Sequence, residues 1–148
     1  MFNPIGVVKS DITEVADSNW GNVVSRIIIN DDLADGLIGL QDFSHLVIVY
    51  HLNKAEFSEK EHLIRRPKGR DDMPNIGIFA QRSKNRPNGI AISNVKLLCV
   101  NKNVVEVQGL DAIDGTPVLD IKPCYPQYDL RENVIVPSWV NELMDGYF

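Results

Sequence analysis

The chain has 148 residues, of which 44% are hydrophobic and 24% are charged, and its formal net charge is −5. This length predicts one domain, residues 1–148, with a core that needs no disulfide or metal. The longest aliphatic and aromatic run, residues 46–50, is too short to cross a bilayer, and the first ten residues lack a secretion signal. We therefore expect a cytoplasmic protein without a membrane segment, whose acidic surface disfavours non-specific binding to nucleic acid.

Six short segments rich in Val and Ile, each bounded by turn-forming residues, predict strands at residues 5–10, 23–29, 45–52, 75–81, 89–100 and 104–110. This pattern is typical of an all-β fold, an antiparallel sheet or barrel. The polar residues 101–103 predict a hairpin between the last two strands. Helical signal is limited to one or two turns within residues 31–43 and a short C-terminal helix in residues 137–148, with Ser138 as its N-cap and Gly146 near its end.

Several familiar chemistries have no support in the sequence. Neither a GxGxxG turn nor a GxxxxGK[ST] loop is present, which argues against a dinucleotide-binding fold and a phosphate-binding loop. His45 and His51 share a face of one predicted strand but lie about 20 Å apart at about 3.3 Å per residue. Cys99 and Cys124 have no paired ligand spacing. We therefore expect free thiols and no metal site.

Two segments carry most of the polar chemistry. Basic side chains gather between residues 65 and 86, opposed there only by Asp71 and Asp72, and they form either a docking site for a polyanion or a set of solvated loop charges: Arg65, Arg66, Lys68, Arg70, Arg82, Lys84 and Arg86. A tight turn with Asn88 follows them. Residues 110–126 place Asp111, Asp114 and Asp120 around an Asp-Gly turn. Together these segments suit a ligand with one positive and one negative end.

Four segments in the same order, "IGVVKS", "ADGLIGLQDFSHLVIVYHLNK", "GIFAQRSKNRPNGIAIS" and "GLDAIDGTPVLDIKPCYP", make the chain resemble the TsaA/TrmO family over residues 5 to 126. The resemblance implies a single-domain β-barrel. It also implies an S-adenosylmethionine-dependent methyltransferase that modifies N6 of threonylcarbamoyladenosine beside the tRNA anticodon. Family members are usually homodimers, so a homodimer is expected here too.

The resemblance also implies functional residues. Cofactor contacts fall on two loops, a strand and a turn: Asn53, Lys54, Arg82, Ile92, Asp114, Gly115, Thr116 and Pro117. Proton removal from N6 calls for a general base, for which Asp111, Asp114 and Asp120 are all candidates. Contacts to the tRNA substrate are expected from Lys84, Arg86, Asn88 and Lys122, with the loop at residues 65–70 near the phosphates.

The chain departs from the family pattern at two places. It reads "RPNGIA" where the family usually has "RPNPIG", and "ADSNWGN", residues 16–22, where the family has a "PRQ" segment in its cofactor site. Asn19 and Trp20 stand close to the expected arginine and glutamine, and they are therefore the cofactor contacts expected from this segment. Trp20 either stacks on adenine or a substrate base, or belongs to the core.

Three interpretations remain open from the sequence. The first is the tRNA methyltransferase. The second is a methyltransferase of the same fold that acts on a small molecule or another nucleoside, in keeping with the negative net charge and the altered loop. The third is a non-catalytic module that binds the cofactor.

Overall fold

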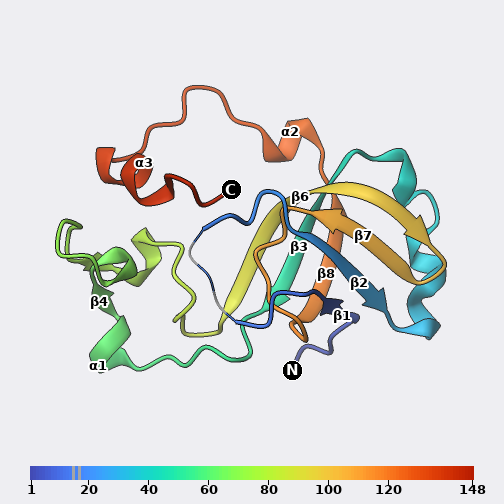
Figure 1. Ribbon diagram of the computed structural model, residues 1–148, viewed down its shortest axis with the longest axis horizontal. Helices are drawn as coiled ribbons and strands as arrows, with labels where there is room; N and C mark the ends of the chain where they lie inside the picture. Colours follow the sequence, from blue (N-terminus) through green and yellow to red (C-terminus); the bar gives the residue numbers. More distant parts are fainter. Residues whose placement is uncertain (15, 17) are drawn as a thin grey trace.

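The computed structural model describes residues 1–14, 16 and 18–148. Six strands form a closed antiparallel barrel in the order β1-β2-β7-β6-β3-β8 (Figure 1). The strands are β1 (Gly6–Lys9), β2 (Val24–Ile29), β3 (His45–His51), β6 (Ile90–Asn101), β7 (Val104–Gln108) and β8 (Pro117–Pro123). The predicted all-β antiparallel barrel is therefore confirmed.

Short elements decorate the barrel. Two 3₁₀ helices, η1 (Asp31–Leu37) and η2 (Leu40–Asp42), connect β2 to β3. They lie within residues 31–43, where one or two helical turns were predicted. The chain between β3 and β6 forms a small lobe beside the barrel, residues 59–80, with α1 (Glu59–His62), β4 (Ile64–Arg65), η3 (Pro67–Gly69), β5 (Ile76–Gly77) and η4 (Ile78–Ala80) (Figure 1). After β8 come α2 (Pro126–Asp129) and α3 (Ser138–Met144). Within the described residues, none of the helices has both the length and the apolar character needed to span a membrane.

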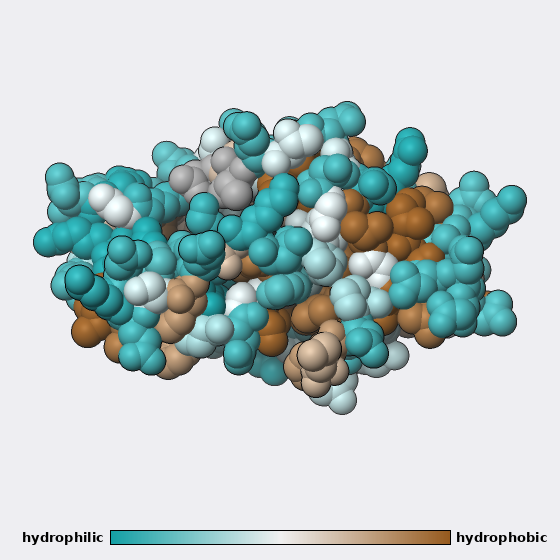
Figure 2. All heavy atoms as spheres, turned by 90° about the horizontal axis from the view of Figure 1, so that it is seen from below, coloured by the Kyte–Doolittle hydropathy of each residue, from teal (hydrophilic) through white to brown (hydrophobic). Residues whose placement is uncertain are grey.

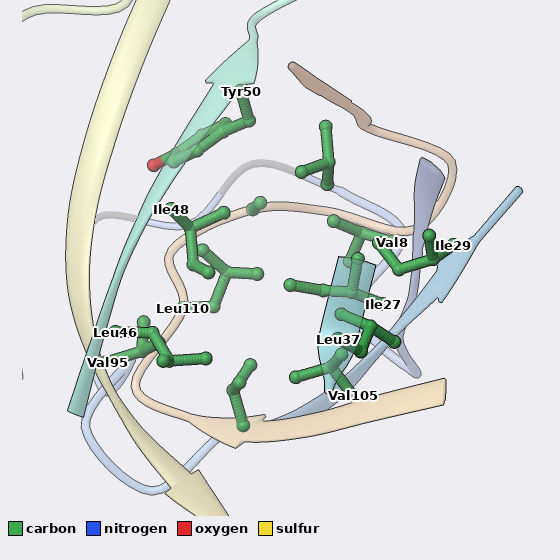
Figure 3. Close-up of a cluster of buried hydrophobic side chains, with 13 residues drawn as sticks. Val8, Ile27, Ile29, Leu37, Leu46, Ile48, Tyr50, Val95, Val105 and Leu110 are labelled. Atoms are coloured by element: carbon green, nitrogen blue, oxygen red, sulfur yellow. The ribbon is translucent and has the colours of Figure 1, made fainter. Parts of the chain in front are cut away.

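The barrel interior is filled by aliphatic side chains from its strands and from the segments that close its ends. Every other residue of a strand faces inward, so the Val- and Ile-rich strands each deliver several apolar side chains to one core. Tyr50 lies at the edge of this cluster with its hydroxyl directed away from the aliphatic groups (Figure 3). The cluster comprises Val8, Ile27, Ile29, Leu37, Leu46, Ile48, Tyr50, Val95, Val105, Val107, Leu110, Ala112 and Val118.

The predicted hairpin joins β6 to β7. Asn101 pairs with Val104, and Lys102 in the turn adopts φ 54°. A left-handed residue of this kind gives the turn the twist that matches its flanking strands. The hairpin prediction is confirmed.

Strand β8 was not predicted from the sequence. Its register against β3 shifts between Val49 and Tyr50, which is a β-bulge. The bulge breaks the alternation of inward and outward side chains that identifies a strand, and a proline stands at each end of β8.

The strand predicted at residues 75–81 is wrong except for Ile76 and Gly77, which form β5. From Ile78 the chain turns into the 3₁₀ helix η4, and the Ile78 amide donates to the carbonyl of Leu63 at 2.9 Å. The buried Gln81 amide ties this turn to the lobe by donating to the carbonyls of Arg65 and Ile76. The apolar residues from Ile78 to Ala80 therefore belong to a compact turn and not to a strand.

The predicted C-terminal helix is confirmed as α3, but its start differs from the prediction. Ser138 is the first helical residue, Pro137 occupies the N-cap position, and no side chain caps the helix. Proline fixes φ near the value that a helix entry needs, so the helix begins without a serine cap. Gly146 adopts φ 68°, which ends the helical path as expected.

Candidate functional site

One end of the barrel collects nearly all of the predicted site residues. At this end β1, β3 and β7 finish and β2, β6 and β8 begin, because His51 pairs with Ile90, Val7 with Pro117 and Val24 with Gln108. We call this end the mouth. Three predicted segments connect strands there: residues 16–22 between β1 and β2, the loop from Asn53 to Gly89 between β3 and β6, and residues 109–116 between β7 and β8. Segments far apart in the sequence thus meet at one opening.

Asp111 lies in the segment that connects β7 to β8 at the mouth, where hydroxyl groups surround its carboxylate. Its Oδ1 accepts hydrogen bonds from Tyr50 at 2.7 Å and from Ser93, and the Tyr50 and Ser93 oxygens are 3.0 Å apart. Its Oδ2 accepts a hydrogen bond from Tyr147 at 2.6 Å. Burial and the neighbouring Asp111 carboxylate raise the pKa of Tyr50 far above its usual range. Tyr50 therefore keeps its proton and acts as a donor at physiological pH.

Sequence reasoning named Asp111 but missed its three partners as site residues. Ser93 and Tyr50 are buried, with 7% and 2% of their surface exposed. Ser93 is a polar residue at an inward position of a strand whose neighbouring inward positions are apolar, which is the signal that could have identified it. Tyr147 lies in the C-terminal segment and gave no such signal.

Asp114 holds a turn at the rim of the mouth. Its Oδ1 accepts from the Ser10 amide at 3.0 Å, and its own amide donates to the carbonyl of Ile12 at 2.7 Å. Gly115 follows with φ 83°, and the buried Thr116 hydroxyl donates to the carbonyl of Ile113 at 2.8 Å. These bonds fix the backbone of the "DGTP" motif, and Pro117 then opens β8.

A hollow of about 390 Å³ borders this rim on the outer face of β1, β2 and β7. Its lining is mostly charged or polar and includes the ion pair of Arg26 with Glu106, whose Nε and Oε2 atoms are 3.5 Å apart. The lining residues are Lys9, Ser10, Asp11, Val24, Arg26, Glu106 and Asp114. A second hollow of about 500 Å³ lies at the opposite end of the barrel, beside η1 and the β6–β7 turn.

Asp120 and Lys122 lie away from the mouth. They form an ion pair, with Nζ and Oδ2 2.8 Å apart, and their side chains are 47% and 66% exposed. The buried side chains of β8 face the core, so this pair belongs to the outer surface of the barrel. The structure therefore separates Asp120 from the other two candidate bases, and Lys122 from the other predicted substrate contacts.

The two arginines of the basic turn bind backbone carbonyls. Arg82 donates to the carbonyl of Ile92 at 3.0 Å, and Arg86 donates to the carbonyls of Ile78 and Gln81 at 3.2 and 2.6 Å. Arg82 is exposed and belongs to none of the ion pairs found among the described residues, so most of its donors face solvent. Arg86 is half-buried and holds the loop together, a structural role that the sequence did not predict.

Charges in the small lobe are partly neutralised from within. Arg70 and Asp72 form a two-pronged ion pair, in which the hydrogen bond raises the pKa of Arg70 and lowers that of Asp72. Arg66 donates to the carbonyls of Asp71 and Met73. The Lys84 carbonyl accepts a hydrogen bond from the Arg86 amide at 3.0 Å, whereas its exposed side chain makes no hydrogen bond or ion pair with the described residues. The end of the molecule that carries α1 and β4 is mostly hydrophilic when it is viewed from below (Figure 2).

Loops at the mouth place the remaining predicted residues. Asn53, Lys54 and Asn88 are exposed near the start of β6, where the amide of Leu52 donates to the carbonyl of Gly89 at 2.7 Å. The Ile92 side chain is 50% exposed. Asn53, Lys54 and Asn88 lie around the opening, whereas the Ile92 side chain lies on the outer face of the barrel, one strand away from Asp120.

The altered segment at residues 16–22 has a packing role in its described part. Trp20 is only 3% exposed, and its indole Nε1 donates to the carbonyl of Ala16 at 3.0 Å. The ring is therefore unavailable for stacking on a ligand in this conformation, and the prediction of a cofactor contact at Trp20 gives way to the core alternative. Asn19 is exposed with φ 66°. Asp17 of the same segment lies outside the described residues.

Metal ligands do not gather at the mouth or elsewhere in residues 1–14, 16 and 18–148, where no group of three or more His, Cys, Asp or Glu side chains could hold an ion. Cys99 and Cys124 are free thiols. The polar side chains described at the mouth are carboxylate, hydroxyl and guanidinium groups.

Comparison with known proteins identifies relatives of the whole barrel. A probable S-adenosyl-L-methionine-binding protein of Pyrococcus abyssi is 33% identical over 146 residues, which are 95% of this chain and 76% of the relative. A tRNA (adenine(37)-N6)-methyltransferase of Mus musculus is 39% identical over 100 residues, or 68% of this chain and 23% of the relative. The names of these relatives agree with the predicted cofactor and the predicted class of reaction.

A solved structure has the same fold. The crystal structure of TrmO from Pseudomonas aeruginosa matches with a TM-score of 0.73 and 27% identity, over 91% of this chain and 60% of that one. The chain thus spans less than two thirds of the solved protein and a smaller part of the mouse enzyme. The model of the tRNA-methyltransferase O N-terminal domain matches residues 9–130, and the chain belongs to this family.

Proposed function

We propose that this protein is an S-adenosylmethionine-dependent methyltransferase that methylates N6 of an adenosine in tRNA, with threonylcarbamoyladenosine beside the anticodon as the acceptor. One observation carries the proposal: loops from three separate parts of the chain meet at the mouth of the barrel around the carboxylate of Asp111. The names of the relatives support the same cofactor and reaction.

The residues at the mouth fit S-adenosylmethionine, which supplies an electrophilic methyl group on a sulfonium when it is bound. Arg82 has guanidinium donors directed to solvent, and a planar fork of this kind suits the carboxylate of the cofactor. The "DGTP" turn offers backbone groups in a fixed conformation, with the Asp114 carboxylate beside them to attract a positive charge. Binding would hold the methyl group in line with the acceptor, and much of the rate would come from this positioning.

Asp111 is the general base that the geometry favours. It lies within the mouth, and its Oδ2 accepts from Tyr147 of the C-terminal segment, a partner that can move away. By contrast, the Asp114 carboxylate holds a turn, and Asp120 lies on the outer surface. N6 of the adenosine would form a bond to the methyl carbon while the bond from that carbon to the sulfonium sulfur breaks, which leaves S-adenosylhomocysteine, and N6 would lose its hydrogen as a proton. The Asp111 carboxylate would accept that proton, while Tyr50 and Ser93 hold the carboxylate in place.

The tRNA would reach the mouth across the small lobe. Arg65, Lys68 and Lys84 are cations on the lobe and its connection to β6, and cations at these places would contact the phosphates of the anticodon arm. A smaller acceptor is the second candidate. It is favoured by the net charge of −5 and by the internal use of Arg66, Arg70 and Arg86, which reduces the positive charge available to RNA.

Calorimetric titration with S-adenosylmethionine tests the cofactor first. We expect micromolar binding by the unmodified protein and a loss of at least tenfold in affinity for Arg82→Ala, since about 1.4 kcal/mol corresponds to tenfold. Arg131→Ala is the matched control, because Arg131 is exposed and its guanidinium bonds, among the described residues, only to the carbonyls of Gln127 and Leu130. Failure of the folded, unmodified protein to bind would contradict the proposal and favour a barrel without methyltransferase activity.

Methyl transfer then identifies the acceptor. Transfer to tRNA that carries threonylcarbamoyladenosine, with little transfer to unmodified tRNA, is the expected result. Turnover of a free nucleoside at the same rate without any tRNA would instead support the second candidate. Cofactor binding without transfer to either acceptor would support the non-catalytic module.

We also propose that the protein works as a homodimer in the cytoplasm. Apolar side chains exposed between α2 and α3 supply surface for such a contact, among them Leu130, Val134 and Ile135, which are 67%, 69% and 93% exposed. Light scattering should give the mass of two chains. A monomer mass at the concentrations used for the activity assay would refute this part of the proposal.

A further inference from the structure

The C-terminal segment crosses the mouth. We call residues 138–148, which comprise α3 and the residues after it, the C-terminal strap. The strap runs from α3 beside the small lobe back toward the barrel (Figure 1). Its Gly146 and Tyr147 carbonyls accept hydrogen bonds from the amides of Asn19 and Trp20 at 3.0 and 2.9 Å. The strap is therefore bonded to the segment where the family has part of its cofactor site.

Gly21 allows this close approach. A Cβ atom added at Gly21 would lie 2.6 Å from the carbonyl carbon of Phe148, closer than real Cβ contacts come. The absence of a side chain at this position therefore lets the end of the strap lie against the loop between β1 and β2. The close packing of the two segments therefore depends on glycine at position 21 and on Phe148 opposite it.

The strap supplies one of the three hydroxyl groups that surround Asp111. Tyr50 and Ser93 approach Oδ1 from β3 and β6, and neither can leave without disrupting the barrel wall. Tyr147 approaches Oδ2 from the strap, and only the strap must move to release it. The accessible oxygen of Asp111 is thus the one that Tyr147 covers.

We propose that the Tyr147 hydroxyl occupies the position on Asp111 Oδ2 that an N–H group of the methyl acceptor takes during the reaction. The structure is then a closed state, and the strap must lift before the acceptor binds. This inference rests on the proposed function, because it assigns the covered oxygen to the base of that reaction. Both partners donate a hydrogen to the same carboxylate oxygen, so the exchange leaves Asp111 hydrogen-bonded throughout.

The chain before the strap permits such a movement. Every residue from 130 to 138 is exposed, so the connection from α2 buries little surface. None of the backbone amides from 131 to 136 donates to another described backbone carbonyl, and Pro137 has no amide hydrogen. Segments with few buried contacts and few backbone hydrogen bonds open at low cost in free energy.

The strap also covers part of the basic surface of the lobe. Lys68 donates to the carbonyl of Leu143 at 3.0 Å, and its Nζ lies 5.5 Å from the centre of the Tyr147 ring. The strap contains two acidic side chains, Glu142 and Asp145, and no basic one. The hydrogen bond to Asp72 is the main cause that raises the pKa of Arg70, and the charge of Glu142 adds a smaller increase. An RNA phosphate would therefore compete with the strap for the same cations.

Tyr147→Phe is the decisive variant, because it removes only the hydroxyl. Tyr128→Phe is the matched control, since Tyr128 is 75% exposed and its hydroxyl makes no hydrogen bond recorded among the described residues. Hydrogen exchange at the Asn19 and Trp20 amides reports strap opening without any ligand. We expect exchange there to rise roughly tenfold in Tyr147→Phe, as the loss of a hydrogen bond to a charged group predicts. Unchanged exchange would overturn the inference.

A measurement of tRNA binding then distinguishes a strap that gates the mouth from a strap that only stabilises the fold. If the strap competes with the acceptor, Tyr147→Phe should bind tRNA up to tenfold more tightly, because a larger fraction of the protein is open. A chain shortened by residues 147–148, which keeps α3, should change in the same direction. Weaker tRNA binding, or a lower kcat with unchanged binding, would overturn the inference and assign Tyr147 to the open site instead.

The two proposals fail in different ways. Absence of cofactor binding by every variant, with exchange still raised by Tyr147→Phe, would remove the proposed function and with it the assignment of Oδ2 to the acceptor. Normal methyl transfer together with unchanged exchange would overturn the strap alone. A swapped contact, in which the strap of one copy closes the mouth of another, would make exchange depend on protein concentration and would overturn the single-chain gate.

Discussion

Replacement of Asp111 by asparagine tests the proposed base most directly. The substitution keeps the shape of the side chain and one carbonyl oxygen, but it removes the negative charge that three hydroxyls now face. If the amide oxygen takes the place of Oδ1, Tyr50 and Ser93 keep an acceptor. Tyr147 must then accept from the amide group instead of donating to a carboxylate.

The cost to stability follows from these exchanges. A hydrogen bond to a charged group contributes about 1.5–3 kcal/mol and a neutral one about 0.5–1.5 kcal/mol. Three bonds weaken, while removal of a half-buried charge from a low-dielectric site offsets part of the loss. We expect Asp111→Asn to lower the free energy of unfolding by about 1–2 kcal/mol, and Tm by roughly 3–6 °C for a chain of this size.

The effect on activity should be far larger. A general base contributes about 10²–10⁴ to the rate, so Asp111→Asn should lower kcat by at least about a hundredfold at a temperature where the variant is folded. Affinity for S-adenosylmethionine should change by less than about threefold, since Asp111 is not among the proposed cofactor contacts. Calorimetry, thermal melting and methyl transfer measured on one preparation separate the three effects.

Asp120→Asn is the matched control. Asp120 pairs with Lys122 on the outer surface, and exposed pairs of this kind contribute about 0–1 kcal/mol. We therefore expect stability and activity close to those of the unmodified protein. If Asp111→Asn retained more than about a tenth of the activity, or if Asp120→Asn lost it, the assignment of the base would be refuted.

Three further predictions concern the barrel and its loops. Gly6→Ala should lower the free energy of unfolding by more than about 2 kcal/mol in a denaturant titration, because its Cβ would overlap a backbone carbonyl of β2; a smaller loss would mean that β1 can shift. Arg86→Ala should increase proteolysis of the loop before β6, since the carbonyls of Ile78 and Gln81 lose their donor; unchanged cleavage would argue against a clamp. Lys84→Ala should weaken tRNA binding and reduce the slope of log affinity against log salt by about 1; an unchanged slope would place Lys84 away from phosphate.

The sequence predicted the barrel well where hydrophobic spacing decides the structure. The strands β2, β3, β6 and β7 are rich in Val and Ile, and these residues make up much of the core. The prediction failed where a tertiary feature overrides the local pattern. The bulge in β8 hides its alternation, and Gln81 draws an apolar segment into a turn by hydrogen bonds that no spacing reveals.

The candidate site could be predicted in its parts but not in its arrangement. The motif at Asp114 and the arginine at position 82 follow from the family pattern, and the strand pairing explains why they meet at one end. The roles of Asp111 and Tyr147 depend on contacts between residues 36 positions apart, and a sequence gives no register for a loop and a terminal segment. Burial of Trp20 was undecided for the same reason, since its neighbours come from the barrel end and the strap.

The distribution of charge links the fold to the choice of acceptor. In ordinary salt a net charge of −5 repels RNA only within about 10 Å, because salt screens it at longer distances, so close approach would depend on the basic small lobe. The lobe is attached beside the mouth, and a phosphate chain bound there would have a base within reach of Asp111. A small acceptor would gain nothing from this arrangement. Because Lys68 lies beneath the acidic strap and can serve the strap or a phosphate but not both fully, the proposed RNA binding would be coupled to the proposed opening of the mouth.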